Sequence, residues 1–334
     1  MNWCFTDVAS EDQCMASALD HTSAVGHDGR ERPARVSEGL VWLAIAVTVV
    51  LWASAFIGIR AAGSDFSAGS LTLGRIAVGT VALTTMVVVV RARRRARGIP
   101  AGPTSVLPRG RLLAVVAAWG IAWFGGYNVT LNAAEQLIDA GTAALLVNIA
   151  PMLVAVLAGL LLGEGFPRRL MVGMGLAFVG VAVIAASTST GKFDPVGVAL
   201  GIVSAVLYAG AATLQKRVLP RVDALTMTWL GCLAGTIACL PFAPALVREA
   251  AAAPTSSILA VAYLGVFPTA IAFLTWGYVL GRSTAGRTAA STYAVPPIVV
   301  LMSWLVLDEL PPAVALLGGA LALAGVAVAT LRRR

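Results

Sequence analysis

The sequence predicts an all-α membrane protein with ten transmembrane helices, arranged as two inverted five-helix repeats. Three observations predict this fold class. The apolar residues gather in runs, one stretch of sequence occurs twice, and the basic residues concentrate in alternate loops. Each run holds about 20 residues, which as a helix crosses roughly 30 Å of hydrocarbon. A barrel would instead alternate polar and apolar residues, whereas these runs are apolar on all sides.

The composition excludes an ordinary soluble domain, because 58% of the residues are apolar, 12% are charged and the mean hydropathy is +0.86. The apolar runs predict membrane spans in the order in which they occur along the chain. The ten expected spans are 40–62, 67–90, 112–134, 138–162, 169–188, 196–215, 225–247, 257–280, 288–307 and 312–331.

The first 38 residues are polar and lack apolar periodicity, so we expect a disordered cytoplasmic tail with no signal peptide. His21 and His27 lie in this tail with too few further ligands for a metal site. Cys232 and Cys239 lie seven residues apart in one span, a spacing that suits small packing residues rather than a redox motif. We therefore expect no cofactor and no metal.

The basic residues predict the orientation. The loop 91–111 holds seven arginines, and a cytoplasmic position for this loop places 20 of the 24 lysines and arginines on the cytoplasmic side. Basic loops of membrane proteins face the cytoplasm. Both termini are therefore expected in the cytoplasm, in the plasma membrane. The net charge of +8 is explained by topology, so we expect the lipid bilayer as a partner and no nucleic acid.

The chain repeats itself without a gap, because residues 141–183 align with 286–328 at a constant offset of 145. Upstream, Trp52-Ala53 and Arg60 align with Tyr208-Ala209 and Lys216 at an offset of 156, since the first half carries a longer basic loop. Five spans per half is an odd number, so the halves must be inverted. The expected domains are a first repeat at 39–190 and a second at 195–334.

These features resemble the drug/metabolite transporter superfamily, specifically a tandem EamA-type transporter. The resemblance is carried by Leu51-Trp52-Ala53-Ser54-Ala55-Phe56, Arg60, Leu73-Gly74-Arg75, Gly141, Pro151, Glu164, Gly173 and Gly180-Val181, with a second copy of the later motifs in 286–328. It covers about residues 40–331. It implies ten helices, a central cavity, and export or exchange of small metabolites. The chain departs from repeat symmetry where Gly231 stands opposite Arg75.

Arg75 is the most informative side chain, because a charge within a span is costly and should face a cavity or a partner. It could anchor the carboxylate of a substrate, which a guanidinium matches with two parallel hydrogen bonds. It could equally hold neighbouring helices together through their carbonyls. The sequence leaves both interpretations open.

Further polar and aromatic residues are candidates for a substrate site. Asparagines within spans either face a cavity or join helices, and aromatic residues either line a pathway or pack. The candidates besides Arg75 are Trp52, Phe56, Tyr127, Asn128, Asn132, Asn148, Tyr208, Trp276 and Tyr293. Three prolines, Pro151, Pro296 and Pro297, are expected to break helices near the midplane and free carbonyls there.

Charged residues at the span ends have simpler interpretations. Arg60 and Lys216 can extend to the membrane interface. Glu164 and Glu309 each precede a proline by three residues, which suits capping of the helix that follows. No carboxylate is expected in the middle of a span, so proton coupling would use a span-edge residue such as Glu135.

The leading functional hypothesis is a secondary transporter that works by alternating access. No P-loop pattern is present, so ATP hydrolysis by this chain is not expected, and neither is enzymatic activity. The resemblance favours export of amino acids or related small metabolites. Drug efflux, small-metabolite uptake, a non-transporting assembly or sensor protein, and a homodimer are left open.

Overall fold

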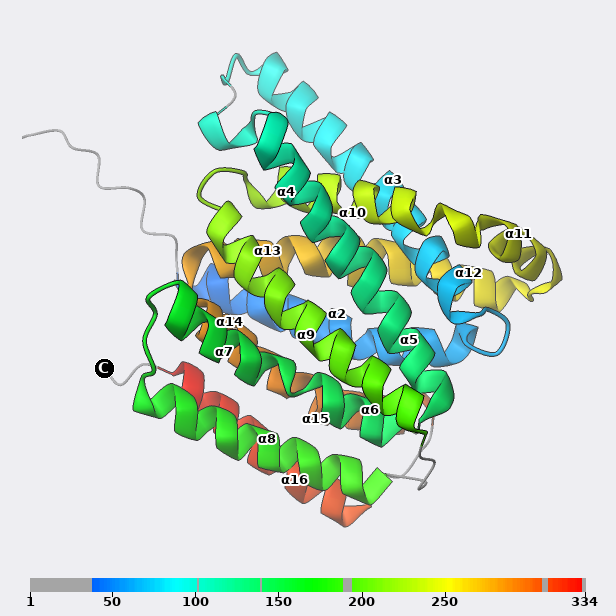
Figure 1. Cartoon of the computed structure of the whole chain (residues 1–334), viewed down its shortest axis with the longest axis vertical. Coiled ribbons are helices and arrows are strands. Elements are labelled where there is room, and N and C mark those ends of the chain that lie inside the picture. Colours follow the sequence, from blue (N-terminus) through cyan, green and yellow to red (C-terminus); the bar gives the residue numbers. More distant parts are fainter. Residues whose placement is uncertain (1–37, 101, 139, 189–193, 308–311, 332–334) are drawn as a thin grey trace, which may run out of the picture. The chain divides into compact units, whose positions relative to one another are not determined.

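The computed structural model describes residues 38–100, 102–138, 140–188, 194–307 and 312–331, and every regular element within them is helical (Figure 1). Residues 1–38 and 39–334 form two separate units, and the account below concerns the second. The expected tail therefore lies outside the described residues, apart from Glu38.

The first half of the chain contains the helices up to α8. They are α2 (Glu38–Ala62), α3 (Ala68–Ala96), η1 (Pro103–Ser105), α4 (Gly110–Gly120), η2 (Ile121–Tyr127), α5 (Asn128–Leu137), α6 (Ala140–Val147), α7 (Ala150–Leu161) and α8 (Arg168–Thr188).

The second half begins at α9. Its helices are α9 (Pro195–Val218), α10 (Ala224–Cys239), η3 (Leu240–Phe242), α11 (Ala243–Ala252), α12 (Thr255–Leu264), η4 (Gly265–Ile271), α13 (Ala272–Arg282), α14 (Ala285–Ser291), η5 (Thr292–Ala294), α15 (Val295–Leu307) and α16 (Ala313–Thr330).

Within the described ranges, nine helical segments are long and apolar enough to cross a membrane. The chain is thus an integral multi-pass membrane protein. The fourth expected span, 138–162, is not among these nine. It is divided into α6 and α7, and only the shorter apolar segment Leu145–Leu161 is found there. The arrangement of ten spans in two repeats therefore remains a prediction.

Both halves contain a π-helical stretch at matching places, η2 in the first and η4 in the second. A π-helix shifts the backbone hydrogen bonds by one residue and leaves carbonyls poorly paired. In η2 the side-chain amide of Asn128 donates to the carbonyls of Trp123 and Phe124, each at 3.1 Å. In η4 the ring of Pro268 removes one backbone donor.

The helices α8 and α16 pack side by side through glycines (Figure 1). A Cβ on Gly173 or Gly180 would collide with the backbone of α16, and a Cβ on Gly318 or Gly325 would collide with that of α8. Small residues allow membrane helices to approach closely enough for van der Waals packing to hold them together. Gly173 and Gly180 are spaced like their repeat counterparts Gly318 and Gly325.

We expect Gly180→Ala to destabilise the protein by about 1–3 kcal/mol, because the added methyl group meets backbone atoms that cannot move aside. Thermal unfolding of the detergent-purified protein measures this effect. Gly175→Ala in the same helix is the matched control, since a Cβ there meets open space. Equal unfolding temperatures for the two variants would contradict the packing argument.

The orientation predicted from the basic loops can be tested with single cysteines on a background without the 4 native ones. Ser64 lies exposed between α2 and α3, and Val106 lies exposed between α3 and α4. A membrane-impermeant maleimide added to intact cells should label Ser64→Cys and leave Val106→Cys unlabelled. The opposite pattern would reverse the topology.

Candidate functional site

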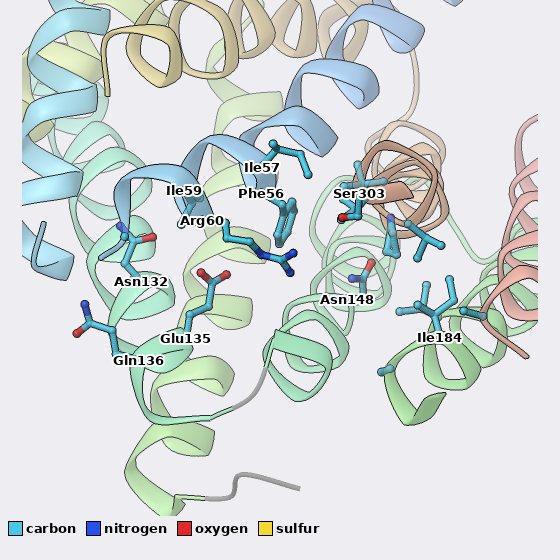
Figure 2. Close-up of a pocket in the computed structure, with 18 of the residues that line it drawn as sticks. Phe56, Ile57, Ile59, Arg60, Asn132, Glu135, Gln136, Asn148, Ile184 and Ser303 are labelled. Carbon is cyan, nitrogen blue, oxygen red and sulfur yellow. The ribbon is translucent and has the colours of Figure 1, made fainter. Parts of the chain in front are cut away.

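Two adjoining cavities lie among the helices. The larger has a volume of about 590 Å³ and the smaller about 110 Å³. Five residues line both cavities and mark where they meet. They are Phe56, Ile59, Glu135, Asn148 and Val295. Figure 2 shows Arg60 of α2, Glu135 of α5 and Asn148 of the break between α6 and α7 projecting into the larger cavity.

The larger cavity opens toward one end of the helices. Its lining includes Gly63 and Phe66 beside the α2–α3 loop, Gln136 at the end of α5, and Pro312 before α16. These residues all lie at the ends of helices that the predicted topology places outside the cell. The cavity is therefore an outward-facing entrance if the basic loops are cytoplasmic.

A cluster of aromatic rings borders the smaller cavity, and we call this cluster the aromatic floor. It consists of Trp52, Trp123, Tyr208, Phe273 and Trp276. Their ring centroids lie 5.2 to 6.2 Å apart in edge-to-face or tilted pairs. Such pairs stabilise one another beyond simple burial of their area. Four of these residues line the smaller cavity, and Trp276 lies outside it.

Arg75 lines the smaller cavity from α3 and is only 6% exposed. Its Nε donates a hydrogen bond to Thr269 Oγ1 in η4 at 3.2 Å, which joins the two halves of the chain. Its two Nη groups donate to no other described residue, so the side chain joins helices and also presents two donors. The buried Nε1 of Trp123, which lines the same cavity, has no acceptor among the described residues.

The helix crossing beside Arg75 depends on a glycine. A Cβ on Gly265 would lie 2.7 Å from the carbonyl oxygen of Arg75, so a larger residue at this position would push α3 away from η4. The matching crossing, which is also between the two halves, is made by Gly120 of α4 against Gly231 of α10, the repeat counterpart of Arg75. The same crossing thus forms with the charged residue and without it.

The asparagines occupy different surroundings. Asn128 lines the smaller cavity, but its side-chain amide nitrogen donates hydrogen bonds to backbone carbonyls of η2. Asn132 lines the larger cavity and donates to Thr72 Oγ1 at 2.9 Å. Asn148 lines both cavities, in the break between α6 and α7 beside Pro151. Pro296 and Pro297 lie in the first turn of α15, directly after η5.

Glu135 was expected at the edge of a span, and it lies two residues before the last residue of α5. The helix α5 continues to Leu137, and Glu135 lines both cavities. It lies three residues after Asn132 and seven after Asn128, on the same helical face. That spacing was the available signal for its position.

Two expected site residues lie away from the cavities. Trp276 is the member of the aromatic floor that does not line the cavity, and its buried Nε1 donates to Gln215 Oε1 at 3.0 Å. Tyr293 is fully buried in a core that includes α8 and α16 residues. Tyr127, Phe56, Trp52 and Tyr208 line the smaller cavity.

The end opposite the entrance, which we call the closed end, holds one contact within the second half and one between the halves. Lys216 Nζ donates to the carbonyls of Leu280 and Ser283 at 2.7 and 2.6 Å. The Glu164 carboxylate accepts from the backbone N–H groups of Ala285 and Gly286 at 2.7 and 3.1 Å. Glu164 was expected to cap the next helix, α8. It instead caps α14, in the other half of the chain, where its charge suits the free N–H groups.

The internal repeat of the sequence relates the closed end to the open end. Five residues that line the larger cavity have repeat counterparts, at offsets of 156 or 145, that are at most 1% exposed. The pairs are Phe56 with Ala212, Ile59 with Gln215, Glu135 with Leu280, Asn148 with Tyr293, and Ser303 with Ala158. This pairing accounts for the burial of Tyr293, because its position corresponds to a cavity wall in the other half.

A family model described as the EamA-like transporter family matches residues 39–186 and 195–331. A "Probable terminal-alkyne amino-acid exporter" from Streptantibioticus cattleyicolor is 36% identical over 290 residues, which cover 86% of this chain and 91% of that protein.

A more distant relative is the "Uncharacterized transporter YdfC" of Bacillus subtilis (strain 168). It is 28% identical, over 87% of this chain and 91% of its own length. A solved structure entitled only "Crystal structure of protein" matches the fold with a TM-score of 0.69 at 23% identity. The match covers 88% of this chain and 98% of that chain.

We expect Lys216→Met to weaken the closed end, because it removes the donor to two helix-end carbonyls. Ala158→Cys should be protected from a thiol reagent in the unmodified protein and become reactive in Lys216→Met, while Ser303→Cys should lose reactivity. Modification can be followed by mass spectrometry of the purified protein.

The matched control for this experiment is Arg221→Met, which removes an exposed positive charge near the same end of α9. It should leave both cysteines as they are in the unmodified protein. Continued protection of Ala158→Cys in Lys216→Met would show that Lys216 does not hold this end closed.

Proposed function

The chain belongs to the EamA-like transporter family, and from this premise we propose that it is a secondary transporter that exports amino acids or related small metabolites by alternating access. The observation that carries the proposal is the pairing of an open cavity with a buried counterpart. Inverted repeats that exchange conformations would close the first and open the second around the same site. The smaller cavity, which lies next to both, would be that site.

The chemistry of the smaller cavity supports a carboxylate-bearing substrate with an apolar part. Arg75 offers two Nη donors whose fork suits a carboxylate, and the aromatic floor offers an apolar surface. The relative from Streptantibioticus cattleyicolor is named as an exporter of an amino acid, which supports the same substrate class for this chain. Coupling to an ion gradient, exchange and facilitated diffusion would all use this site.

Drug efflux and metabolite uptake are the competing functions within the transporter class. The aromatic floor would suit an apolar drug as well as an amino-acid side chain. Flux of a labelled panel in proteoliposomes separates these functions, because it measures both the chemical class that is moved and its direction. A non-transporting assembly protein would show no flux of any compound.

The substrate anchor is tested by Arg75→Lys in the same flux assay. Lysine keeps the charge but loses the planar fork and the Nε bond to Thr269, so transport should fall at least tenfold while the protein remains folded. Abundance and unfolding temperature report folding. Arg248→Lys, on the exposed surface of α11, is the control and should transport normally. Parallel loss of transport and folded protein would make Arg75 a helix-joining residue only.

A further inference from the structure

Glu135 is an acidic side chain near the end of α5, two residues before Leu137. The positive charge of Arg75 acts on it, and Figure 2 shows the Arg60 side chain pointing toward it in the larger cavity. Glu135 lines both cavities from α5. Arg75 lines the smaller cavity with both Nη groups unused by described residues. One small cavity thus has two side chains of opposite charge in its lining.

The fold itself requires neither charge. The repeat counterpart of Arg75 is Gly231, and the counterpart of Glu135 is the fully buried Leu280. The corresponding crossing of α10 with α4 forms at Gly231, where there is no charge. Charged residues within a span are costly and mark functional sites. The two charges are therefore better explained by what enters the cavity than by what holds the helices together.

The combination of charges restricts the ligand. A simple carboxylate could pair with Arg75, but it would bring a second negative charge into the cavity that Glu135 lines. A simple amine could pair with Glu135, but it would leave the Arg75 guanidinium without an anion. A ligand with both charges complements both side chains, because each of its charges then has a partner of opposite sign in the lining.

We propose that Arg75 and Glu135 together recognise the zwitterionic head group of an α-amino acid. Arg75 binds the carboxylate, Glu135 binds the ammonium group, and the amino-acid side chain lies against the aromatic floor. The unpaired Nε1 of Trp123 supplies a further donor to the carboxylate. This inference rests on the proposed transport function and makes Glu135 a residue that determines its specificity.

Three ligands of matched shape test the inference. Norvaline carries both charges, pentanoate lacks the ammonium group, and butylamine lacks the carboxylate. Binding to the purified protein is measured by ligand-induced thermal stabilisation, because a ligand that binds the folded state raises the unfolding temperature. We expect the unmodified protein to bind norvaline at least tenfold more tightly than either partial ligand.

Glu135→Gln keeps the size of the side chain and removes its charge. In this variant norvaline should bind at least tenfold more weakly, while pentanoate should bind as well as before or better. Arg75→Gln should reduce the binding of norvaline and pentanoate and spare that of butylamine. Glu135→Asp, which keeps the charge, should retain most of the preference for norvaline. Pentanoate binding by Glu135→Gln also reports that this variant is folded.

The outcomes separate the inference from the proposed function. Equal binding of norvaline and pentanoate by the unmodified protein, with flux intact, overturns zwitterion recognition and leaves transport standing. An undiminished preference for norvaline in Glu135→Gln overturns the role of Glu135 alone. Absence of flux for every amino acid in proteoliposomes overturns the proposed function, and the inference falls with it.

Discussion

A guanidinium group inside the hydrocarbon is the constraint on which the rest of this structure depends. Removing a charge from water is costly unless hydrogen bonds and counter-charges replace the lost hydration. Arg75 meets part of this requirement through Thr269, which belongs to the opposite half of the chain. Thr269 is available because η4 is a π-helical stretch, and α3 can approach it because Gly265 lacks a side chain. The contact that satisfies the charge is therefore the same contact that joins the two halves beside the smaller cavity.

The two halves share their helix crossings but not their chemistry. The first half contributes Arg75, Glu135 and Asn148 to the cavities, and the counterparts in the second half are glycine, leucine and tyrosine. The second half contributes much of the aromatic floor, including Tyr208 and Phe273. A site made of two identical halves would present the same groups to both ends of a ligand. In this site the first half supplies the charged residues Arg75 and Glu135 together with aromatic rings, whereas the lining from the second half is uncharged, so the two ends of a ligand would meet different groups.

The sequence predicts the helical membrane architecture well, because hydropathy and internal alignment depend on many residues at once. It also indicates that Arg75 matters, since a lone charge in an apolar run is conspicuous. Other features escape it for physical reasons. The π-helical stretches shift hydrogen bonds by one residue without changing the apolar pattern. Glu164 caps α14, and the pairing is concealed because the donor N–H group of Ala285 lies 121 positions further along the chain. Tyr293 looks like a cavity residue by alignment with Asn148, yet the closed end buries it.

The glycine contact between α8 and α16 has a mechanical consequence. When the two repeats are exchanged, Gly173 takes the place of Gly318 and Gly180 takes the place of Gly325. The contact of Gly173 with Gly325 then becomes the contact of Gly318 with Gly180, which already exists. The pseudo-two-fold axis thus passes through this helix pair. If the two halves exchange conformations, residues elsewhere would contact different residues, but the residues of this helix pair would keep the same contacts. In the proposed cycle of alternating access, this helix pair would serve as a fixed pivot, because its own contacts would be the same in both states.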